Sequence, residues 1–363
     1  MKLWLDTSKT YAIALEGGGA KGAYEVGVWR ALDEADVRFD AVAGTSVGAL
    51  NGAMMVMGEL EQALRLWENI RFSQVFDADD EQLKKLYDHK LSEVDFRTLF
   101  KDAIEAIHEG GLDIEPLRRL IAEWVDEEKI RSSPKKLFLV TYSLTDKREL
   151  DMDADELEEG KLRDMLLASA YVPLFQRKKL DGKDYVDGSV HNIVPISSLL
   201  ERGYRDIIVI RIFGVGFEKR TRIPEDANII TVAPREKLGG VLQFDAAQSR
   251  RLLQLGYFDG LRMLYGLAGE KYYIDRQWSE TEAYFALQEL CRLFIKEETP
   301  SLWALNETIL PKLAKHLKVK DGGYYDLLTA LLERLAERQG ISPFRVRTEE
   351  MLLLEIAAKM KKK

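Results

Sequence analysis

Short apolar runs, each ended by glycine or polar residues, mark the first two thirds of the chain. Residues 10–15 (TYAIAL) are apolar at odd and even positions alike and precede a glycine run, which predicts a strand buried on both faces. Similar runs predict further strands at 39–43, 137–142, 207–210 and 229–232. Helical spacing over 23–35 and 47–57 separates the first strands. This alternation predicts an α/β sheet with right-handed crossovers.

Helical periodicity without strands occupies two other parts of the chain. Residues from about 59 to 130 are amphipathic and predict a helical insert, with loops at 77–81 and 109–111. After Pro234 the strand pattern stops, and residues 240–363 show helical periodicity only. We therefore expect an α/β domain at residues 1–235, with the insert at 59–130, and a helical C-terminal region at 236–363.

Composition and charge narrow the class of protein. The 363 residues are 46% apolar and 31% charged, which suits a large buried core and excludes a disordered chain. The formal net charge of −8 offers no basic surface for nucleic acid. Cys291 is the single cysteine, so neither an internal disulfide nor a cysteine-rich metal site is expected.

The sequence predicts neither a membrane-spanning segment nor a signal peptide. Residues 41–58 carry no charge, but four glycines together with Ser46 and Asn51 make the segment too polar to cross a bilayer. The N-terminus lacks the apolar core of a signal peptide. We expect a cytoplasmic protein, with peripheral contact to a membrane surface left open.

A glycine-rich segment, residues 17–22 (GGGAKG), joins the first strand to the first helix. Glycine lets the backbone approach a ligand closely, and a helix N-terminus presents free N–H groups, so the segment is suited to an oxyanion or a phosphate. Gly17, Gly19 and Gly22 also satisfy the dinucleotide-binding spacing, although Asp40, the candidate ribose ligand, begins the second strand rather than ending it. A nucleotide site therefore stays open as an alternative.

Residues 44–48 (GTSVG) lie between a strand and a buried helix and match the nucleophile elbow, in which small residues allow a strained turn that exposes a serine. The alternative is a turn in which Ser46 only caps the helix. A nucleophilic serine needs a base, and histidines are few: His89, His108, His191 and His316. Only His191 lies near predicted sheet elements, so a carboxylate base is worth considering.

Asp187 is the best candidate for that carboxylate. It ends a short apolar run and is followed by Gly188, although an Asp-Gly hairpin turn would have the same sequence. Taken together, the glycine loop, the elbow and this Asp-Gly pair resemble the patatin-like phospholipases over about residues 10–234. Asn192 and Pro195 lie five and eight residues after Asp187, as is common in that family.

The resemblance implies a role for each matching position. Ser46 would be the nucleophile and Asp187 the base. The oxyanion-hole loop would include Gly17, Gly18, Gly19, Lys21 and Gly22, and the remaining motif positions would be Gly44, Gly48, Gly188 and Ser189. Ala168-Ser169, Pro173 and Phe175 resemble a further family stretch. Two positions depart from the family pattern: Ser189 replaces a glycine or alanine, and Tyr171 replaces an alanine and could reshape the acyl pocket.

The resemblance also implies a fold and an activity. We expect a three-layer α/β/α sandwich and a serine–aspartate lipid acyl hydrolase that acts on lipid or phospholipid esters without a metal or another cofactor. Gly18 and Gly19 would donate N–H groups to the oxyanion, and burial would raise the pKa of Asp187 towards that of a useful base. The alternatives are a serine acyltransferase or thioesterase with His191 as base, and a non-catalytic nucleotide- or lipid-binding regulator. Positional specificity, headgroup and oligomeric state do not follow from the sequence.

Overall fold

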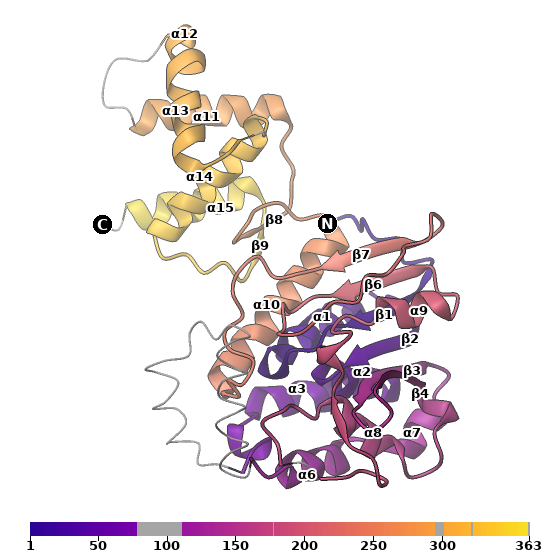
Figure 1. The fold of residues 1–363 in the computed structure, drawn as a ribbon. Helices are drawn as coiled ribbons and strands as arrows, with labels where there is room; N and C mark the ends of the chain where they lie inside the picture. Colours follow the sequence, from indigo (N-terminus) through magenta and orange to yellow (C-terminus); the bar gives the residue numbers. More distant parts are fainter. Residues whose placement is uncertain (78–110, 177, 295–300, 321, 362–363) are drawn as a thin grey trace. The chain divides into compact units, whose positions relative to one another are not determined.

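The computed structural model describes residues 1–77, 111–176, 178–294, 301–320 and 322–361 (Figure 1). His89, His108 and the middle of the predicted insert, with most of its two loops, lie outside these residues. The chain forms two compact units, residues 6–260 and residues 1–5 with 261–363.

The unit at residues 6–260 is built on a seven-stranded sheet of described residues in the order β4-β3-β2-β1-β6-β7, with β5 paired to β3. Its strands are β1 (Thr10–Leu15), β2 (Arg38–Thr45), β3 (Lys136–Ser143), β4 (Arg148–Asp153), β5 (Tyr185–Asp187), β6 (Asp206–Ile210) and β7 (Asn228–Val232). Neighbouring strands along the path β3-β2-β1-β6-β7 are parallel, whereas β4 and β5 run antiparallel to β3. Every strand predicted from an apolar run is confirmed.

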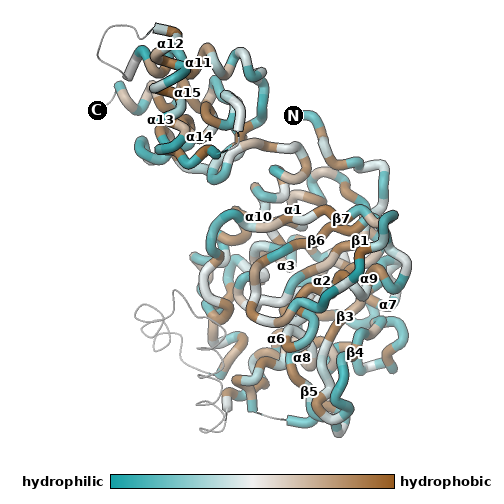
Figure 2. The backbone as a smooth tube through the Cα atoms, turned by 45° about the horizontal axis from the view of Figure 1, so that its top comes forward, coloured by the Kyte–Doolittle hydropathy of each residue, from teal (hydrophilic) through white to brown (hydrophobic). Residues whose placement is uncertain are grey.

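Helices cover both faces of this sheet. On one face lie α1 (Ala23–Glu34) and α2 (Val47–Met57), and α2 approaches the sheet so closely that a Cβ on Gly48 would be 2.6 Å from the Leu15 carbonyl oxygen. On the other face, α9 (Ile196–Glu201) packs through Leu199 and Leu200 on small residues such as Ala12 and Ala14. Successive residues of a strand point to opposite faces, so β1 serves both layers. The three-layer α/β/α arrangement is confirmed, and Figure 2 shows the hydrophobic strands β1 and β6 within it.

Further helices of this unit surround the ends of the sheet. They are α3 (Leu60–Asn69), α6 (Glu115–Trp124), α7 (Glu127–Ser132) and α8 (Leu162–Ser169). The described flanks of the predicted insert are therefore helical. Single helical turns are present at Gly19–Gly22, Phe72–Gln74, Ala154–Glu156 and Gly188–Val190.

A long helix, α10 (Ala246–Tyr265), packs on α1 through glycines. A Cβ on Gly27 would be 2.1 Å from the Leu253 carbonyl oxygen, and one on Gly256 would be 2.0 Å from the Tyr24 carbonyl oxygen. Larger residues would force the two helices apart. These contacts join most of α10 to the sheet, so the compact units divide after Gly260, whereas the sequence changes character after Pro234.

The second unit contains α11 (Glu280–Phe294), α12 (Leu302–Ala304), a π-helical turn (Leu305–Ile309), α13 (Leu310–Leu317), α14 (Tyr324–Arg338) and α15 (Glu349–Met360). The expectation of helices alone is wrong here, because β8 (Tyr273–Ile274) and β9 (Val346–Arg347) form a parallel pair. Strands of two residues are too short to give a periodic pattern. None of the helices described in either unit is both long and apolar enough to span a bilayer.

Candidate active site

Ser46 occupies a strained position between β2 and α2. Its φ of 56° lies in the left-handed region that non-glycine residues rarely adopt. The turn closes because its neighbours are small: a Cβ on Gly44 would be 2.3 Å from the Gly48 carbonyl oxygen. The side chain of Ser46 is buried, with 6% of its surface exposed. The geometry agrees with a nucleophile elbow.

Ser169, at the end of α8, holds this turn in place. Its hydroxyl accepts a hydrogen bond of 2.9 Å from the Ser46 amide and donates one of 2.6 Å to the Val140 carbonyl. The Ser46 amide is therefore occupied by the protein itself. Ser169 is fully buried. The sequence analysis placed it in a stretch that resembles the family but predicted no role for it in the site.

The register of β3 brings Asp187 to Ser46. Val140 of β3 pairs with Thr45 at the end of β2, and the next residue, Thr141, pairs with Asp187 at the end of β5. Since β2 and β5 meet adjacent positions on one strand, Ser46, the residue after Thr45, is placed beside Asp187. The Ser46 side chain is close enough to the Asp187 carboxyl to lower the pKa of that carboxyl.

Asp187 is almost fully buried, with 4% of its surface exposed. Burial raises the pKa of its carboxyl above the ordinary value, while hydrogen bonds from the Ser46 side chain and the Ser189 amide act in the opposite direction. The Ser189 amide donates at 2.8 Å to Oδ1, and the Asp187 amide donates at 2.9 Å to the Tyr171 carbonyl. The carboxyl is thus oriented by backbone groups.

The glycine loop lies against the same two residues. The Gly17 amide donates to the Ile193 carbonyl at 3.0 Å, so it is already used. Within the described residues, the amides of Gly18 and Gly19 donate to no protein group, and both glycines line a cavity together with Ser46. Gly19 has a φ of 56° and would place a Cβ 2.1 Å from the Val241 carbonyl oxygen. These two amides are the candidate oxyanion donors of the loop.

The other motif residues have packing or positioning contacts. Lys21 donates through Nζ to the Phe213 carbonyl, and its burial lowers the pKa of the ammonium. A Cβ on Gly22 would be 2.5 Å from the Val47 side chain, and one on Gly188 would be 2.4 Å from the Val140 carbonyl oxygen. Tyr171 lines neither of the two cavities that adjoin Ser46. Its hydroxyl instead bonds to the Gln176 carbonyl and the Lys178 amide.

Glu16, which precedes the glycine loop, is a site residue that the sequence analysis missed. Its buried carboxylate pairs with Arg211 at 2.9 Å and accepts hydrogen bonds from the amides of Ile212, Phe213 and Gly214 at 2.8, 3.1 and 3.1 Å. It therefore fixes the loop after β6, residues 211–217, beside the glycine loop. The sequence feature that could have indicated Glu16 is its position as a single acidic residue at the end of the apolar run 10–15.

His191 pairs with Glu149 rather than with Ser46 or Asp187. Its side chain is 46% exposed, its Nδ1 pairs with Glu149 of β4, and its ring stacks on Tyr142 with the centroids 5.9 Å apart. His316, in the other unit, is exposed at the end of α13. Neither of these histidines has a recorded contact with Ser46 or Asp187.

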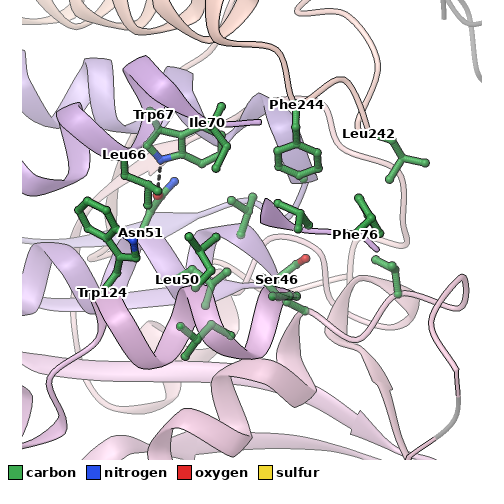
Figure 3. Close-up of a pocket in the computed structure, with 18 of the residues that line it drawn as sticks. Ser46, Leu50, Asn51, Leu66, Trp67, Ile70, Phe76, Trp124, Leu242 and Phe244 are labelled. Carbon is green, nitrogen blue, oxygen red and sulfur yellow. Dashed lines mark hydrogen bonds between the residues drawn. The ribbon is translucent and has the colours of Figure 1, made fainter. Parts of the chain in front are cut away.

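A mostly apolar cavity, here called the aromatic cavity, extends from Ser46 along α2 (Figure 3). It holds about 810 Å³ of empty space, part of it open to solvent. Its bulkiest lining residues are Trp67, Phe76, Trp124, Phe175 and Phe244. Besides Ser46, the polar side chain in the lining is that of Asn51, which accepts a hydrogen bond from the Trp67 indole at 3.0 Å and donates to Glu25 at 2.7 Å.

A second cavity, here called the loop cavity, also has Ser46 in its lining. It holds about 1130 Å³ of empty space, again partly open to solvent, and its lining includes Asp187, Val190, Val215 and Phe217. Ser46, Gly19, Val172, Val241 and Leu242 line both cavities. Ser46, the candidate nucleophile, is thus located where two apolar spaces meet.

The described residues contain no group of three or more His, Cys, Asp and Glu side chains arranged to hold a metal ion. What they bring together is a buried serine, a buried carboxylate of raised pKa, two free backbone amides and apolar space on either side. Such an arrangement can transfer an acyl group to and from serine.

Comparison with known proteins gives a family match over more than half of the chain. The family model described as "Patatin-like phospholipase" matches residues 13–200. Among curated proteins, "Lysophospholipase nte1" of Aspergillus terreus is 48% identical over 46 residues, which are 13% of this chain and 3% of that protein. "Patatin-like phospholipase domain-containing protein 6" of Homo sapiens is 50% identical over 48 residues, 13% of this chain and 4% of that protein.

These matches span only a small part of the curated relatives' length. Among solved structures, VipD from Legionella pneumophila aligns with 97% of this chain and 87% of its own, with a TM-score of 0.43 and 14% identity.

Proposed function

This chain belongs to the patatin-like phospholipase family, and we propose that it is a lipid acyl hydrolase in which Ser46 is the nucleophile and Asp187 the general base. The observation that carries the proposal is the placement of the buried Asp187 carboxyl beside Ser46, by the register of β3, in the lining of one cavity. The pairing of His191 with Glu149 supports a pair of residues rather than a triad.

In the proposed reaction, Ser46 Oγ attacks the ester carbonyl carbon while its proton passes to the Asp187 carboxylate. The carbonyl oxygen becomes an oxyanion, which the amides of Gly18 and Gly19 stabilise, each by about 3–4 kcal/mol in comparable sites. Collapse of this intermediate breaks the ester bond, and the proton on Asp187 passes to the departing alcohol. Water then attacks the acyl-serine and gives a proton to Asp187. Collapse of the second intermediate breaks the bond to Ser46 Oγ, which takes that proton back from Asp187 as the fatty acid is released.

The two cavities support lipid esters as the substrate class. Because Ser46 lines both, an acyl chain in the aromatic cavity would place its carbonyl beside Ser46, while the rest of the lipid would occupy the loop cavity. Burial of apolar carbon in such a space contributes about 0.8 kcal/mol for each methylene. Long-chain esters should therefore be better substrates than short ones.

Three single variants test the proposal against the histidine-based alternative. With any ester that the wild type hydrolyses, Ser46→Ala and Asp187→Asn should each lower kcat by at least about 10²–10⁴-fold, whereas His191→Ala should retain most activity. A serine-directed fluorophosphonate probe should label the wild type and not Ser46→Ala. Loss of activity in a folded His191→Ala variant would instead favour a histidine base and the acyltransferase or thioesterase alternative.

A further inference from the structure

The loop after β6 exposes aromatic side chains beside the catalytic residues. Phe213 and Phe217 have 53% and 59% of their surface exposed, and Val190, across the loop cavity, has 37%. Single exposed apolar residues are common on soluble proteins. A group of them at the rim of an apolar cavity is the usual mark of a contact surface.

Phe213 is held outward at a conformational cost. Its φ is 47°, in the left-handed region that a bulky side chain rarely adopts. The conformation is held by Glu16, which accepts hydrogen bonds from the amides of Ile212, Phe213 and Gly214. Lys21 bonds to the Phe213 carbonyl. The protein thus maintains a strained backbone at Phe213, whose ring is 53% exposed and has the Arg211 guanidinium carbon 5.7 Å from its centroid.

Phe217 is fixed equally firmly to the catalytic turn. Its amide donates to the Ser189 carbonyl at 2.8 Å, and its carbonyl accepts from the Ile193 amide at 2.8 Å. Phe217, Val215 and Val190 all line the loop cavity, which also contains Ser46 and Asp187. The exposed apolar rim is therefore continuous with the space in which the substrate is proposed to bind.

Positive charge follows directly along the same loop. Lys219, Arg220 and Arg222 lie within four residues. Lys219 pairs with Glu149, whereas Arg220 and Arg222 are exposed, and the ion pairs recorded for the described residues include neither of them. Aromatic rings next to cations suit the boundary of an anionic bilayer, where rings enter the headgroup region and cations contact lipid phosphates.

We propose that residues 213–222, here called the docking loop, bind an anionic lipid surface. Phe213 and Phe217 enter the headgroup region, and Arg220 and Arg222 contact anionic headgroups. The loop cavity then opens onto the lipid, so that an ester reaches Ser46 without crossing water. This purpose rests on the proposed hydrolase function, whereas the binding itself does not depend on catalysis.

The experiment measures flotation of the full chain with vesicles of ether-linked lipids, which contain no ester to hydrolyse. One set contains phosphatidylcholine alone, and the other contains phosphatidylcholine with about 30% phosphatidylglycerol. We expect flotation with the anionic set, weakened by salt because surface charges are screened. Phe213→Asn should lower partitioning about tenfold, and Arg220→Glu with Arg222→Glu should lower it by at least that factor.

Asparagine adopts the left-handed conformation readily, so Phe213→Asn should fold, which circular dichroism checks. Phe285→Asn is the matched control, because Phe285 is 57% exposed but lies on α11 of the other unit. It should float like the wild type. The proposal would be overturned if the docking-loop variants partitioned like the wild type. It would also be overturned if Phe285→Asn lost as much partitioning as Phe213→Asn.

Hydrolysis of a water-soluble ester is measured in parallel. A wild type that hydrolyses this ester but does not float with either vesicle set overturns lipid docking and leaves the proposed function standing. In that case the docking loop would face a protein or a second copy of the chain. A wild type that floats but hydrolyses no ester supports docking and counts against the hydrolase.

Discussion

Asp187 is subject to two opposing demands. Burial raises the pKa of its carboxyl, which makes the carboxylate a better proton acceptor for a serine hydroxyl. The same burial makes the charged form costly in the folded protein. Hydrogen bonds from Ser46 and the Ser189 amide reduce this cost without removing it. Catalysis at this residue is therefore expected to lower the stability of the fold.

Asp187→Asn tests this trade-off. Because the folded pKa lies above the unfolded one, the folded state binds more protons between the two values. The contribution of Asp187 to stability therefore falls as pH rises through that interval and stays low at neutral pH. The Asp187→Asn variant, which we expect to be inactive, should unfold at higher urea than the wild type at pH 7. This gain should shrink as pH falls from the folded pKa of Asp187 to the unfolded pKa of about 4 and stay constant below that value. A variant less stable at pH 7 would contradict the role of burial.

The same shift predicts the pH profile of the wild type. The base must be ionised to accept the proton of Ser46, so kcat/KM should rise with pH through the folded pKa of Asp187. Its acidic limb should have a midpoint above 3.8, the ordinary value for aspartate. Measurement of kcat/KM on a soluble ester from pH 4 to 9 checks this, with His191→Ala expected to give the same midpoint.

At the scale of elements, the site depends on loops that are fastened to strands by buried polar groups. Ser169 fastens the elbow to β3, and Glu16 fastens the loop 211–217 to the end of β1. The fit between the two glycine-containing loops is tight, since a Cβ on Gly214 would be 1.8 Å from the Gly17 carbonyl oxygen. Movement of either loop would displace the amides of Gly18 and Gly19.

Glu16→Gln should therefore weaken both the fold and catalysis. Glutamine keeps the shape of glutamate but loses the charge that pairs with Arg211 and one of two acceptor oxygens. We expect a loss of about 1–3 kcal/mol in unfolding free energy and a fall in kcat with KM for a short soluble ester little changed. Glu218→Gln is the matched control, because Glu218 also pairs with Arg211 but is half exposed, and exposed pairs contribute only about 0–1 kcal/mol. Equal effects of the two variants would refute a positioning role for Glu16.

At the scale of the whole molecule, the residues proposed for chemistry belong to one compact unit. Both cavities around Ser46 are lined by residues between Gly18 and Phe244, inside the unit at 6–260. The second unit has its own core of residues from β8, α11, α14 and α15, with the buried Glu349 accepting a hydrogen bond of 2.7 Å from the Tyr325 hydroxyl. We expect each core to tolerate small changes in the other.

Tyr325→Phe measures this independence. The change removes the hydrogen bond to Glu349 and should lower the unfolding free energy of the second unit by about 1–3 kcal/mol. With the protein still folded, kcat/KM for a water-soluble ester should stay within about twofold of the wild type, since the described residues that line the two cavities all lie in the unit at 6–260. A tenfold loss in kcat/KM would show that the second unit contributes to catalysis.

Local pattern determined much of this protein. The apolar run at 10–15 and the helix at 47–57 have the observed bounds of β1 and α2, because the periodicity of a few residues reports their burial. The small residues around Ser46 similarly specify a sharp turn, since larger ones would collide with the backbone.

Only the tertiary structure decided which distant groups meet. The aromatic cavity draws residues from Gly19 to Phe244, and Glu16 meets the loop 211–217 nearly two hundred residues later. His191 is turned towards Glu149 although it lies four residues from Asp187. The two-residue strands β8 and β9 exist only because they pair with each other. Side-chain direction and long-range pairing depend on the register of the whole sheet and the packing of its layers, and local periodicity carries no information about either.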